Sequence, residues 1–310
     1  MNSIRIALAQ MQAQSADVTG NLTKIERFAR DAATRGADLI CYPELCLQGY
    51  SCSSQGLKPL QIPGPAVERI VALAQTYGLA MLVGMVEYSP KSKPYITHLI
   101  AYPHGNWDLY RKTHLGVHEK SCFAPGQELP VFHYKKTTFG LLICWDLHFP
   151  ETAALLALKG AEIIFAPHAS PVAGADRRRI WLKYLPARAY DNTVFLACCN
   201  QVGHDGTGRI FGGGAMVIDP RGNVLTEAFY QGDHLLVADL QPELLNAIRA
   251  GRHAAMRHRF YHQARRPELY TGLVCSKKLN QAAPSTEVQR KAAGPHAQAK
   301  NHCCKNNVKT

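Results

Sequence analysis

The sequence predicts an α/β protein in which two mixed β-sheets are covered by helices. Apolar segments typical of buried strands alternate along the chain with segments whose apolar residues recur at helical spacing. In addition, ATRGADLICYPE (33–44) resembles ALKGAEIIFAPH (157–168) in its order of helix end, glycine, acidic residue, apolar strand and proline. Two similar helix–strand units are expected in a sandwich of two sheets with helices outside.

In the first half of the chain, apolar runs predict strands and helical periodicity predicts helices. Strands are expected over 4–11, 37–44, 79–87, 95–103 and 106–112, and helices over 21–35 and 65–77. In the first helix Leu22, Ile25 and Ala29 share a face, and Gly36 supplies a stop signal. The strands 95–103 and 106–112 form a predicted hairpin, so at least one sheet is expected to contain antiparallel pairs.

The second half repeats the alternation. Strands are expected over 137–144, 161–167, 193–201, 212–220 and 234–240, and helices over 149–160, 177–190 and 242–251. Pro150 and Glu151 occupy the first turn of the helix 149–160, where a proline and an acidic residue are favoured. The region 1–272 is therefore predicted to fold as one domain.

The net charge of +12 is concentrated near the end of the chain. Residues 249–266 and 273–310 each carry a net charge of +6, so the remainder is close to neutral. No nucleic-acid-binding motif accompanies the basic residues, and nucleic acid is not an expected partner. Residues 273–310 lack apolar periodicity and are predicted to form a disordered basic tail, in which Cys303 and Cys304 are expected to be incidental rather than metal ligands.

The apolar segments are too short for membrane spans, and the first residues lack the pattern of a signal peptide. We therefore expect a cytoplasmic protein without membrane contact. The ten cysteines are irregularly spaced, which favours reduced thiols over a disulfide framework.

Cys144 is the candidate nucleophile because of its position. Cys198 and Cys199 lie inside a predicted apolar strand, whereas Cys144 ends one and leads into a helix that starts near Pro150. A sharp strand-to-helix turn exposes its side chain and presents backbone N–H groups. A thiol with an ordinary pKa of about 8.5 is mostly protonated at neutral pH, so a nucleophilic Cys144 requires a base.

Three further polar residues follow predicted strands and provide candidate partners. Glu44 ends the strand 37–44, Lys112 ends the strand 106–112, and Glu119 follows shortly afterwards. Each also has a structural alternative. Glu44 would cap a loop, Lys112 would be a solvated lysine at a sheet edge, and Glu119 would pair with Lys120. His114 and His118 lie near Cys122 and suggest a zinc site, but we interpret His114 as structural and expect no metal.

Taken together, PEL (43–45), YRKTHL (110–115), ICWD (143–146) and FPE (149–151) resemble the nitrilase superfamily of carbon–nitrogen hydrolases. The resemblance extends from about Ile4 to Tyr270. It implies a four-layer αββα sandwich, a homodimer or higher homo-oligomer, and catalysis without a cofactor.

The resemblance also implies residue roles. Glu44 would be the general base, Cys144 the nucleophile, and Lys112 the group that stabilises the oxyanion together with the backbone N–H of Trp145. Glu119 would orient the substrate or Lys112. The expected reaction is hydrolysis of a non-peptide C–N bond in a small amide or N-carbamoyl amine, through a thioester and with release of ammonia or an amine.

The substrate is less defined by the sequence. Relatives that hydrolyse N-carbamoyl amino acids tend to carry arginine just after the Cys-x-Asp, where this chain has Leu147 and His148. An anionic N-carbamoyl amino acid is therefore disfavoured. Trp145, His148 and His168 are predicted to contact the substrate.

Three alternatives remain at this point. The same residues can attack a nitrile, and only products distinguish that reaction. A catalytically inactive binding protein on the same fold is a second alternative, although Glu44, Lys112 and Cys144 are all present. Acyl transfer is a third, but the N-acyltransferase branch of the superfamily carries membrane spans that this sequence lacks.

Overall fold

The computed structural model describes residues 1–51, 58–251 and 260–275. The chain divides into two units, Met1–Ala264 and Arg265–Thr310. The described part of the second unit comprises a 3₁₀ turn, Pro267–Leu269, and the short helix α6 (Thr271–Cys275). Helix α6 crosses the predicted boundary at residue 272, which stays a prediction, and most of the predicted tail lies outside the described residues.

Met1–Ala264 contains two six-stranded mixed sheets. The first has the order β14-β1-β2-β3-β4-β5 and the second the order β13-β12-β9-β8-β7-β6. The strands of the first sheet are β1 (Ile4–Gln10), β2 (Leu39–Cys41), β3 (Ala80–Glu87), β4 (Tyr95–Ala101), β5 (Trp107–Arg111) and β14 (His234–Leu240). Those of the second are β6 (Phe132–Tyr134), β7 (Thr137–Leu141), β8 (Ile163–His168), β9 (Phe195–Asn200), β12 (Ala215–Ile218) and β13 (Val224–Ala228).

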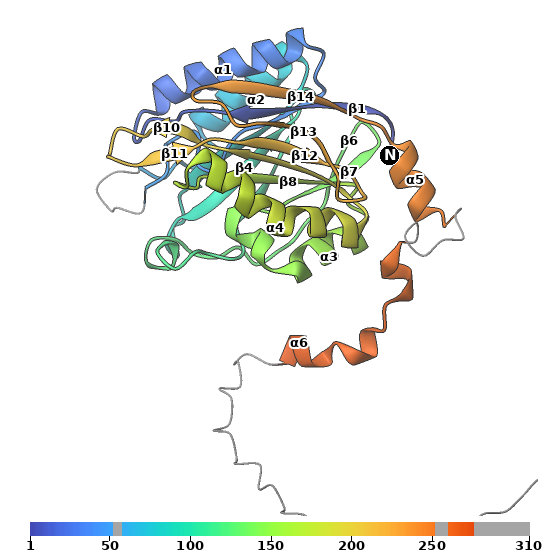
Figure 1. Ribbon diagram of the computed structural model, residues 1–310. Coiled ribbons are helices and arrows are strands. Elements are labelled where there is room, and N and C mark those ends of the chain that lie inside the picture. The colour runs from blue at the N-terminus through green and yellow to red at the C-terminus, as the bar shows by residue number, and fades with distance from the viewer. Residues whose placement is uncertain (52–57, 252–259, 276–310) are drawn as a thin grey trace, which may run out of the picture. The chain divides into compact units, whose positions relative to one another are not determined.

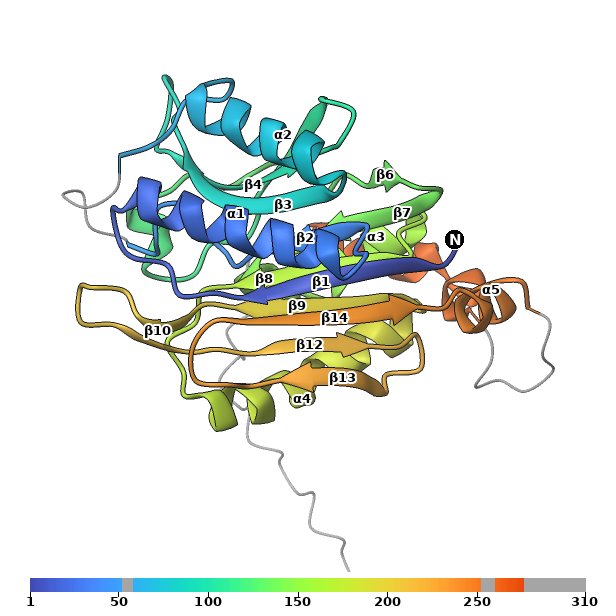
Figure 2. The same cartoon turned by 90° about the horizontal axis from the view of Figure 1, so that it is seen from above.

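Helices cover the outer face of each sheet (Figure 1). The helices are α1 (Val18–Thr34), α2 (Pro65–Tyr77), α3 (Pro150–Leu158), α4 (Gly174–Asn192) and α5 (Glu243–Arg249). Helices α1 and α2 pack on the first sheet, and α3 and α4 pack on the second (Figure 2). The predicted four-layer αββα sandwich is therefore confirmed.

Side-chain alternation along β1 explains why the strand is apolar on both faces. Ile4, Ile6 and Leu8 contribute to the core between the two sheets, whereas Ala7 and Ala9 face helix α1. In the second sheet, β7, β8 and β9 run parallel, as β1, β2 and β3 do in the first. Parallel strands with both faces covered account for continuous apolar runs.

Four strands were not predicted: β6, β13, and the small antiparallel pair β10 (Val202–His204) and β11 (Ile210–Gly212). The strand expected over 212–220 is interrupted before β12, because Gly213 and Gly214 adopt positive φ angles of 72° and 119°. Helix α1 begins three residues earlier than expected, since the Asp17 carboxylate accepts a hydrogen bond from the Gly20 N–H and caps the helix.

The two resembling segments, 33–44 and 157–168, occupy equivalent places. Each contains the end of an outer helix, α1 or α3, and then a strand in the centre of its sheet, β2 or β8. No helix within the described ranges is long and apolar enough to cross a membrane. Arg249, from the basic region 249–266, donates hydrogen bonds to the carbonyl oxygens of Ala161 and Thr193 and so fastens the end of α5 to the sandwich.

Candidate active site

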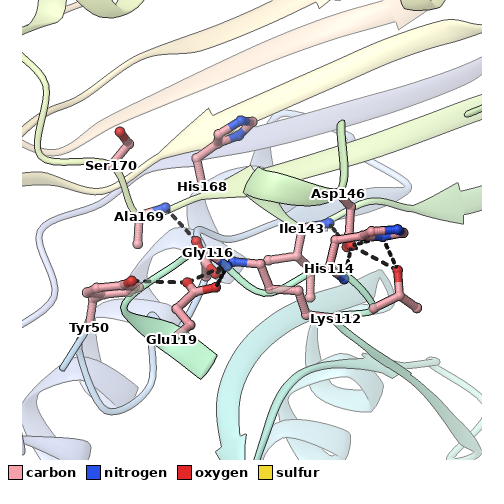
Figure 3. Close-up of polar contacts among 12 residues, drawn as sticks. Tyr50, Lys112, His114, Gly116, Glu119, Ile143, Asp146, His168, Ala169 and Ser170 are labelled. Carbon is pink, nitrogen blue, oxygen red and sulfur yellow. Dashed lines mark hydrogen bonds and ion pairs between the residues drawn. The ribbon is translucent and has the colours of Figure 1, made fainter. Parts of the chain in front are cut away.

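The candidate site is formed where segments following strands of the two sheets meet (Figure 3). Glu44 follows β2, and Lys112 follows β5. Glu119 begins the 3₁₀ turn η1 (Glu119–Ser121), and Cys144 begins the 3₁₀ turn η2 (Cys144–His148). The sequence placed these residues at segment ends, and the fold brings those ends together.

Lys112 lies between two carboxylates. Its Nζ donates hydrogen bonds to Glu44 Oε1 at 2.7 Å and to Glu119 Oε1 at 2.8 Å. The three side chains are almost fully buried, with exposed fractions of 1%, 0% and 5%. Burial lowers the pKa of Lys112, but the negative charges of Glu44, a Cys144 thiolate and Glu119 outweigh it and raise the pKa above its usual range. Lys112 is therefore a permanent buried cation.

Glu44 is fixed by both sheets. Its Oε2 accepts the backbone N–H of Ala169, the residue after β8, at 3.0 Å, and its carbonyl oxygen accepts the Gln201 side-chain amide at 2.8 Å. Gly84 in β3 leaves room for this turn, because a Cβ there would lie 2.5 Å from the nitrogen of Leu45. These contacts aim the carboxylate at Lys112.

The acidity of Glu44 is shifted toward neutrality. Burial raises its pKa to about 7, opposed by the positive charge of Lys112 and assisted by the negative charge of Glu119. A carboxyl group that titrates near neutral pH exchanges protons readily in both directions.

Cys144 occupies an unusual backbone conformation. Strand β7 ends at Leu141, three residues earlier than predicted, and Cys144 has a φ angle of +47°. This left-handed conformation is rare for residues other than glycine and costs on the order of 1–2 kcal/mol. Cys144 is half-buried, whereas Cys198 and Cys199 are buried within β9, as the sequence indicated.

The Cys144 thiol is protonated at rest. Burial and the negative charge of Glu44 together raise its pKa to about 12, although the positive charge of Lys112 acts in the opposite direction. A nucleophilic Cys144 must therefore lose its proton during attack, and Glu44 and Lys112 both lie close enough for their charges to act on it.

Asp146 holds the Cys144 turn against the segment that carries Lys112, a role the sequence reasoning missed. Its buried carboxylate accepts hydrogen bonds from the Ile143 N–H at 3.0 Å, the Tyr110 hydroxyl at 2.8 Å, the Thr113 hydroxyl at 2.9 Å and the His114 N–H at 2.7 Å. The position of Asp146, two residues after Cys144, was visible in the sequence. Most of its hydrogen-bond donors, however, come from the segment 110–114 in and after β5. His114 therefore contributes to this network, in agreement with its structural interpretation.

Glu119 is held by its own loop and by a distant tyrosine. The Gly116 N–H donates to Oε2 at 2.7 Å, and the Tyr50 hydroxyl donates to Oε1 at 3.0 Å. The structural alternative for Glu119 was an ion pair with Lys120. In the structure Glu119 forms its ion pair with Lys112. Tyr50 had no recognisable signal in the sequence.

The predicted substrate contacts have different surroundings. Trp145 is 40% exposed and borders a cavity of about 360 Å³ that is also lined by His114, Phe123 and Phe149. The His148 ring makes tilted contacts with the rings of Trp145 and Tyr184, with ring centroids at 4.6 and 4.8 Å. Burial, followed by the charges of Arg188 and Arg177, lowers the pKa of His148, which favours its neutral form.

His168 differs from the expectation of a loop residue. It is the last residue of β8, it is 1% exposed, and its ring lies 5.0 Å from that of Trp181. Its Nδ1 faces the Ala166 carbonyl oxygen at 2.8 Å, so Nδ1 carries the proton and Nε2 is left as an acceptor. Burial and the charge of Arg177 lower the His168 pKa to about 3. Its predicted contact with substrate stays a prediction.

Comparison with known proteins identifies the family. Residues 5–250 match the family model for carbon-nitrogen hydrolase. The chain is 33% identical over 278 residues to a "Hydrolase in pqqF 5'region" of Pseudomonas protegens, covering 88% of this chain and 93% of that protein. It is 31% identical to the N-carbamoylputrescine amidase of Solanum lycopersicum, covering 83% of this chain and 91% of that protein.

A solved structure agrees with these sequence matches. A nitrilase-superfamily amidase of Nesterenkonia AN1 has a TM-score of 0.74 and 32% identity, covering 87% of this chain and 97% of that one. Other structures of that amidase contain butyramide, or the acetamide moiety of fluoroacetamide attached to its active-site cysteine. These matches exclude a fold-only resemblance and establish an amidase-type hydrolase of C–N bonds. The chain therefore belongs to the carbon–nitrogen hydrolase family of the nitrilase superfamily.

Proposed function

We propose that this protein hydrolyses a small amide or N-carbamoyl amine through a thioester on Cys144. The observation that carries the proposal is the buried contact of Lys112 with Glu44 and Glu119 beside a half-buried thiol. Glu44 is the general base, Lys112 the donor to the oxyanion, and Glu119 the residue that holds Lys112 in place.

In the first half-reaction, the Glu44 carboxylate accepts the thiol proton while Cys144 Sγ bonds to the carbonyl carbon. The carbonyl oxygen becomes an oxyanion, which Lys112 and the backbone N–H of Trp145 stabilise. The Glu44 carboxyl then returns its proton to the leaving nitrogen, and the C–N bond breaks. Ammonia or an amine departs, and an acyl thioester remains.

In the second half-reaction, Glu44 removes a proton from water as the water oxygen attacks the thioester. The resulting oxyanion collapses, the C–S bond breaks, and the thiolate receives the proton from Glu44. Both halves need a group that gains and returns a proton near neutral pH, and the Glu44 pKa of about 7 suits that role. A donor preorganised in a buried site contributes about 3–4 kcal/mol to oxyanion stabilisation in comparable enzymes.

The comparisons support a substrate of this class. The relatives include an N-carbamoylputrescine amidase, and the structurally similar amidase binds butyramide. The active-site cysteine of that amidase forms a covalent adduct, which supports the same kind of chemistry for Cys144. We propose accordingly that Trp145 and the residues around its cavity contact the substrate.

The test is ammonia release by wild-type protein and by Cys144→Ala across simple amides, N-carbamoyl amines and nitriles. Turnover of amides or carbamoyl compounds that is lost in Cys144→Ala is the expected result, with Cys122→Ala as a matched control at another incompletely buried thiol. Trapping of an acyl adduct on Cys144, read by mass spectrometry, would locate the intermediate. Turnover of nitriles alone would replace the proposal with a nitrilase activity, and equal activity in Cys144→Ala would refute the thioester.

A further inference from the structure

Arg177 is a buried arginine of helix α4. It lies in the first turns of α4 and is 6% exposed. Its neighbours on the helix are paired, Arg178 with Glu227 and Arg179 with Asp176. Within residues 1–51, 58–251 and 260–275, no carboxylate forms an ion pair with Arg177, and its contact is the neutral hydroxyl of Ser170.

This arrangement is costly unless a ligand completes it. A buried guanidinium that lacks a counter-ion retains a large desolvation penalty, and each unsatisfied N–H adds to it. Arg177 Nε is one of the buried atoms without a hydrogen-bond partner in the described residues. Burial lowers the pKa of Arg177 below its ordinary value, which is the signature of the same penalty. Stability alone does not favour an arginine here.

Arg177 is connected to the candidate site through the segment that follows β8. Ser170, which contacts its Nη2, follows Ala169, and Ala169 donates its N–H to Glu44 (Figure 3). The charge of Arg177 also acts on the Cys144 thiol, whose pKa it lowers. The guanidinium is therefore within electrostatic range of the reacting sulfur.

Two other buried polar atoms without partners adjoin Arg177. The Arg177 guanidinium lies 6.0 Å from the ring centroid of Trp181, and the Trp181 ring lies 5.0 Å from that of His168. Trp181 Nε1 and His168 Nε2 both lack partners among the described residues. Arg177 and Trp181 contribute unsatisfied donors, so the cluster is suited to a ligand rich in acceptor atoms.

Charge balance leads to the same class of ligand. Lys112 is shared between Glu44 and Glu119, so these three groups together are negative when both carboxylates are ionised. They would repel an anionic substrate. Arg177 supplies the compensating charge, and its planar fork matches a carboxylate in two-point geometry.

We propose that Arg177 binds a carboxylate of the substrate and that the enzyme prefers amides or N-carbamoyl compounds bearing an acid group. This inference rests on the proposed function of the same site. It reverses the sequence-based expectation against anionic substrates, which considered only positions 147 and 148. Arg177 lies on helix α4, whereas positions 147 and 148 lie in the turn that begins at Cys144.

The experiment compares acid and neutral substrates of matched length. Monoamides of four- and five-carbon dicarboxylic acids and 3-ureidopropanoate are paired with butyramide, pentanamide and propylurea. Wild-type kcat/KM is expected to favour the acid of at least one pair. Arg177→Met is expected to lower kcat/KM for that acid about 100-fold, mainly through KM, because it removes one member of a buried charge pair. The neutral partner should lose less, because it keeps only the effect of the Arg177 charge on the Cys144 thiol and has no carboxylate to lose.

Two controls separate binding from folding. Arg177→Lys keeps the charge without the planar fork and should recover part of the loss, and Arg178→Met tests an exposed arginine of the same helix. Equal losses on acid and neutral substrates, or no wild-type preference for any acid, would overturn the inference while leaving the amidase proposal intact.

Calorimetry on Cys144→Ala protein tests the contact of Arg177 with a carboxylate independently of turnover. Binding of an acid monoamide that is lost in the Cys144→Ala/Arg177→Met protein supports the role of Arg177 without any turnover. If the wild-type protein hydrolyses no amide yet this binding is present, the proposed function and the substrate preference fail, and only the contact of Arg177 with a carboxylate stands. Binding that is unaffected by Arg177→Met overturns the inference.

Discussion

The backbone N–H of Ala169 donates a 3.0 Å hydrogen bond to Oε2 of Glu44. The two residues follow β8 and β2, the strands of the two segments that resemble each other in sequence. The residue that follows one of these segments therefore orients the carboxylate that ends the other. Because the other oxygen of Glu44 accepts from Lys112, the carboxylate position depends on both sheets at once.

Removing the buried cation should affect both activity and stability. Lys112→Met is expected to lower kcat at least 100-fold, because it removes the proposed oxyanion donor. It also leaves Glu44 and Glu119 buried without their cation, which costs about 3–5 kcal/mol before either carboxyl is protonated. Activity and chemical denaturation check this expectation, and Lys91→Met, at an exposed lysine, is the control. Unchanged kcat would contradict the role of Lys112.

The pH profile should report the Glu44 carboxylate. Burial raises the Glu44 pKa to about 7. The proposed role of Glu44 as general base requires its ionised form, so kcat/KM is expected to rise with pH and level off above about 7. The stability effect has the opposite sign. A raised native pKa favours folding below the unfolded value, and this contribution is lost as pH rises through 7.

Glu119 provides an independent check on that assignment. Its negative charge raises the Glu44 pKa, so Glu119→Gln is expected to move the acidic limb of kcat/KM to lower pH. Glu44→Gln should abolish turnover. A limb that stays near 7 in Glu119→Gln would indicate that another group controls the profile.

The Asp146 network predicts a loss of both stability and alignment. Asp146→Asn keeps the size of the side chain but replaces an acceptor that serves several donors, and should destabilise the fold by about 2–4 kcal/mol. Tyr110→Phe removes one of these donors and should cost about 1 kcal/mol. Denaturation midpoints compare the two variants. Equal effects would contradict the expectation that the remaining hydrogen bonds to Asp146 add further stability.

The backbone conformation at Cys144 predicts a difference in stability between its glycine and alanine variants. Cys144→Gly should be more stable than Cys144→Ala by up to about 1 kcal/mol, because glycine adopts the φ angle of +47° without steric cost. Both variants lack the thiol, so both should be inactive. Thermal denaturation measures the difference, and a more stable alanine variant would show that the turn carries no strain.

The sequence by itself determined the order of helices and strands, the sandwich class and the addresses of Glu44, Lys112, Glu119 and Cys144. Apolar periodicity reports local structure, and residues at strand ends can be read from where that periodicity stops. Short edge strands such as β6 and β13 were not predicted, because partly exposed segments of three to five residues show little apolar periodicity.

Only the tertiary structure decided which charges meet. The pairing of Lys112 with Glu44, the convergence of Tyr110 and Thr113 on Asp146, and the contact of Arg177 with Ser170 join segments from different elements of the fold. A charged residue looks alike in sequence whether its partner is water, a carboxylate or a substrate. Burial distinguishes these cases, because it sets the cost of leaving the charge unpaired and shifts its pKa, and burial is a property of the packed sheets.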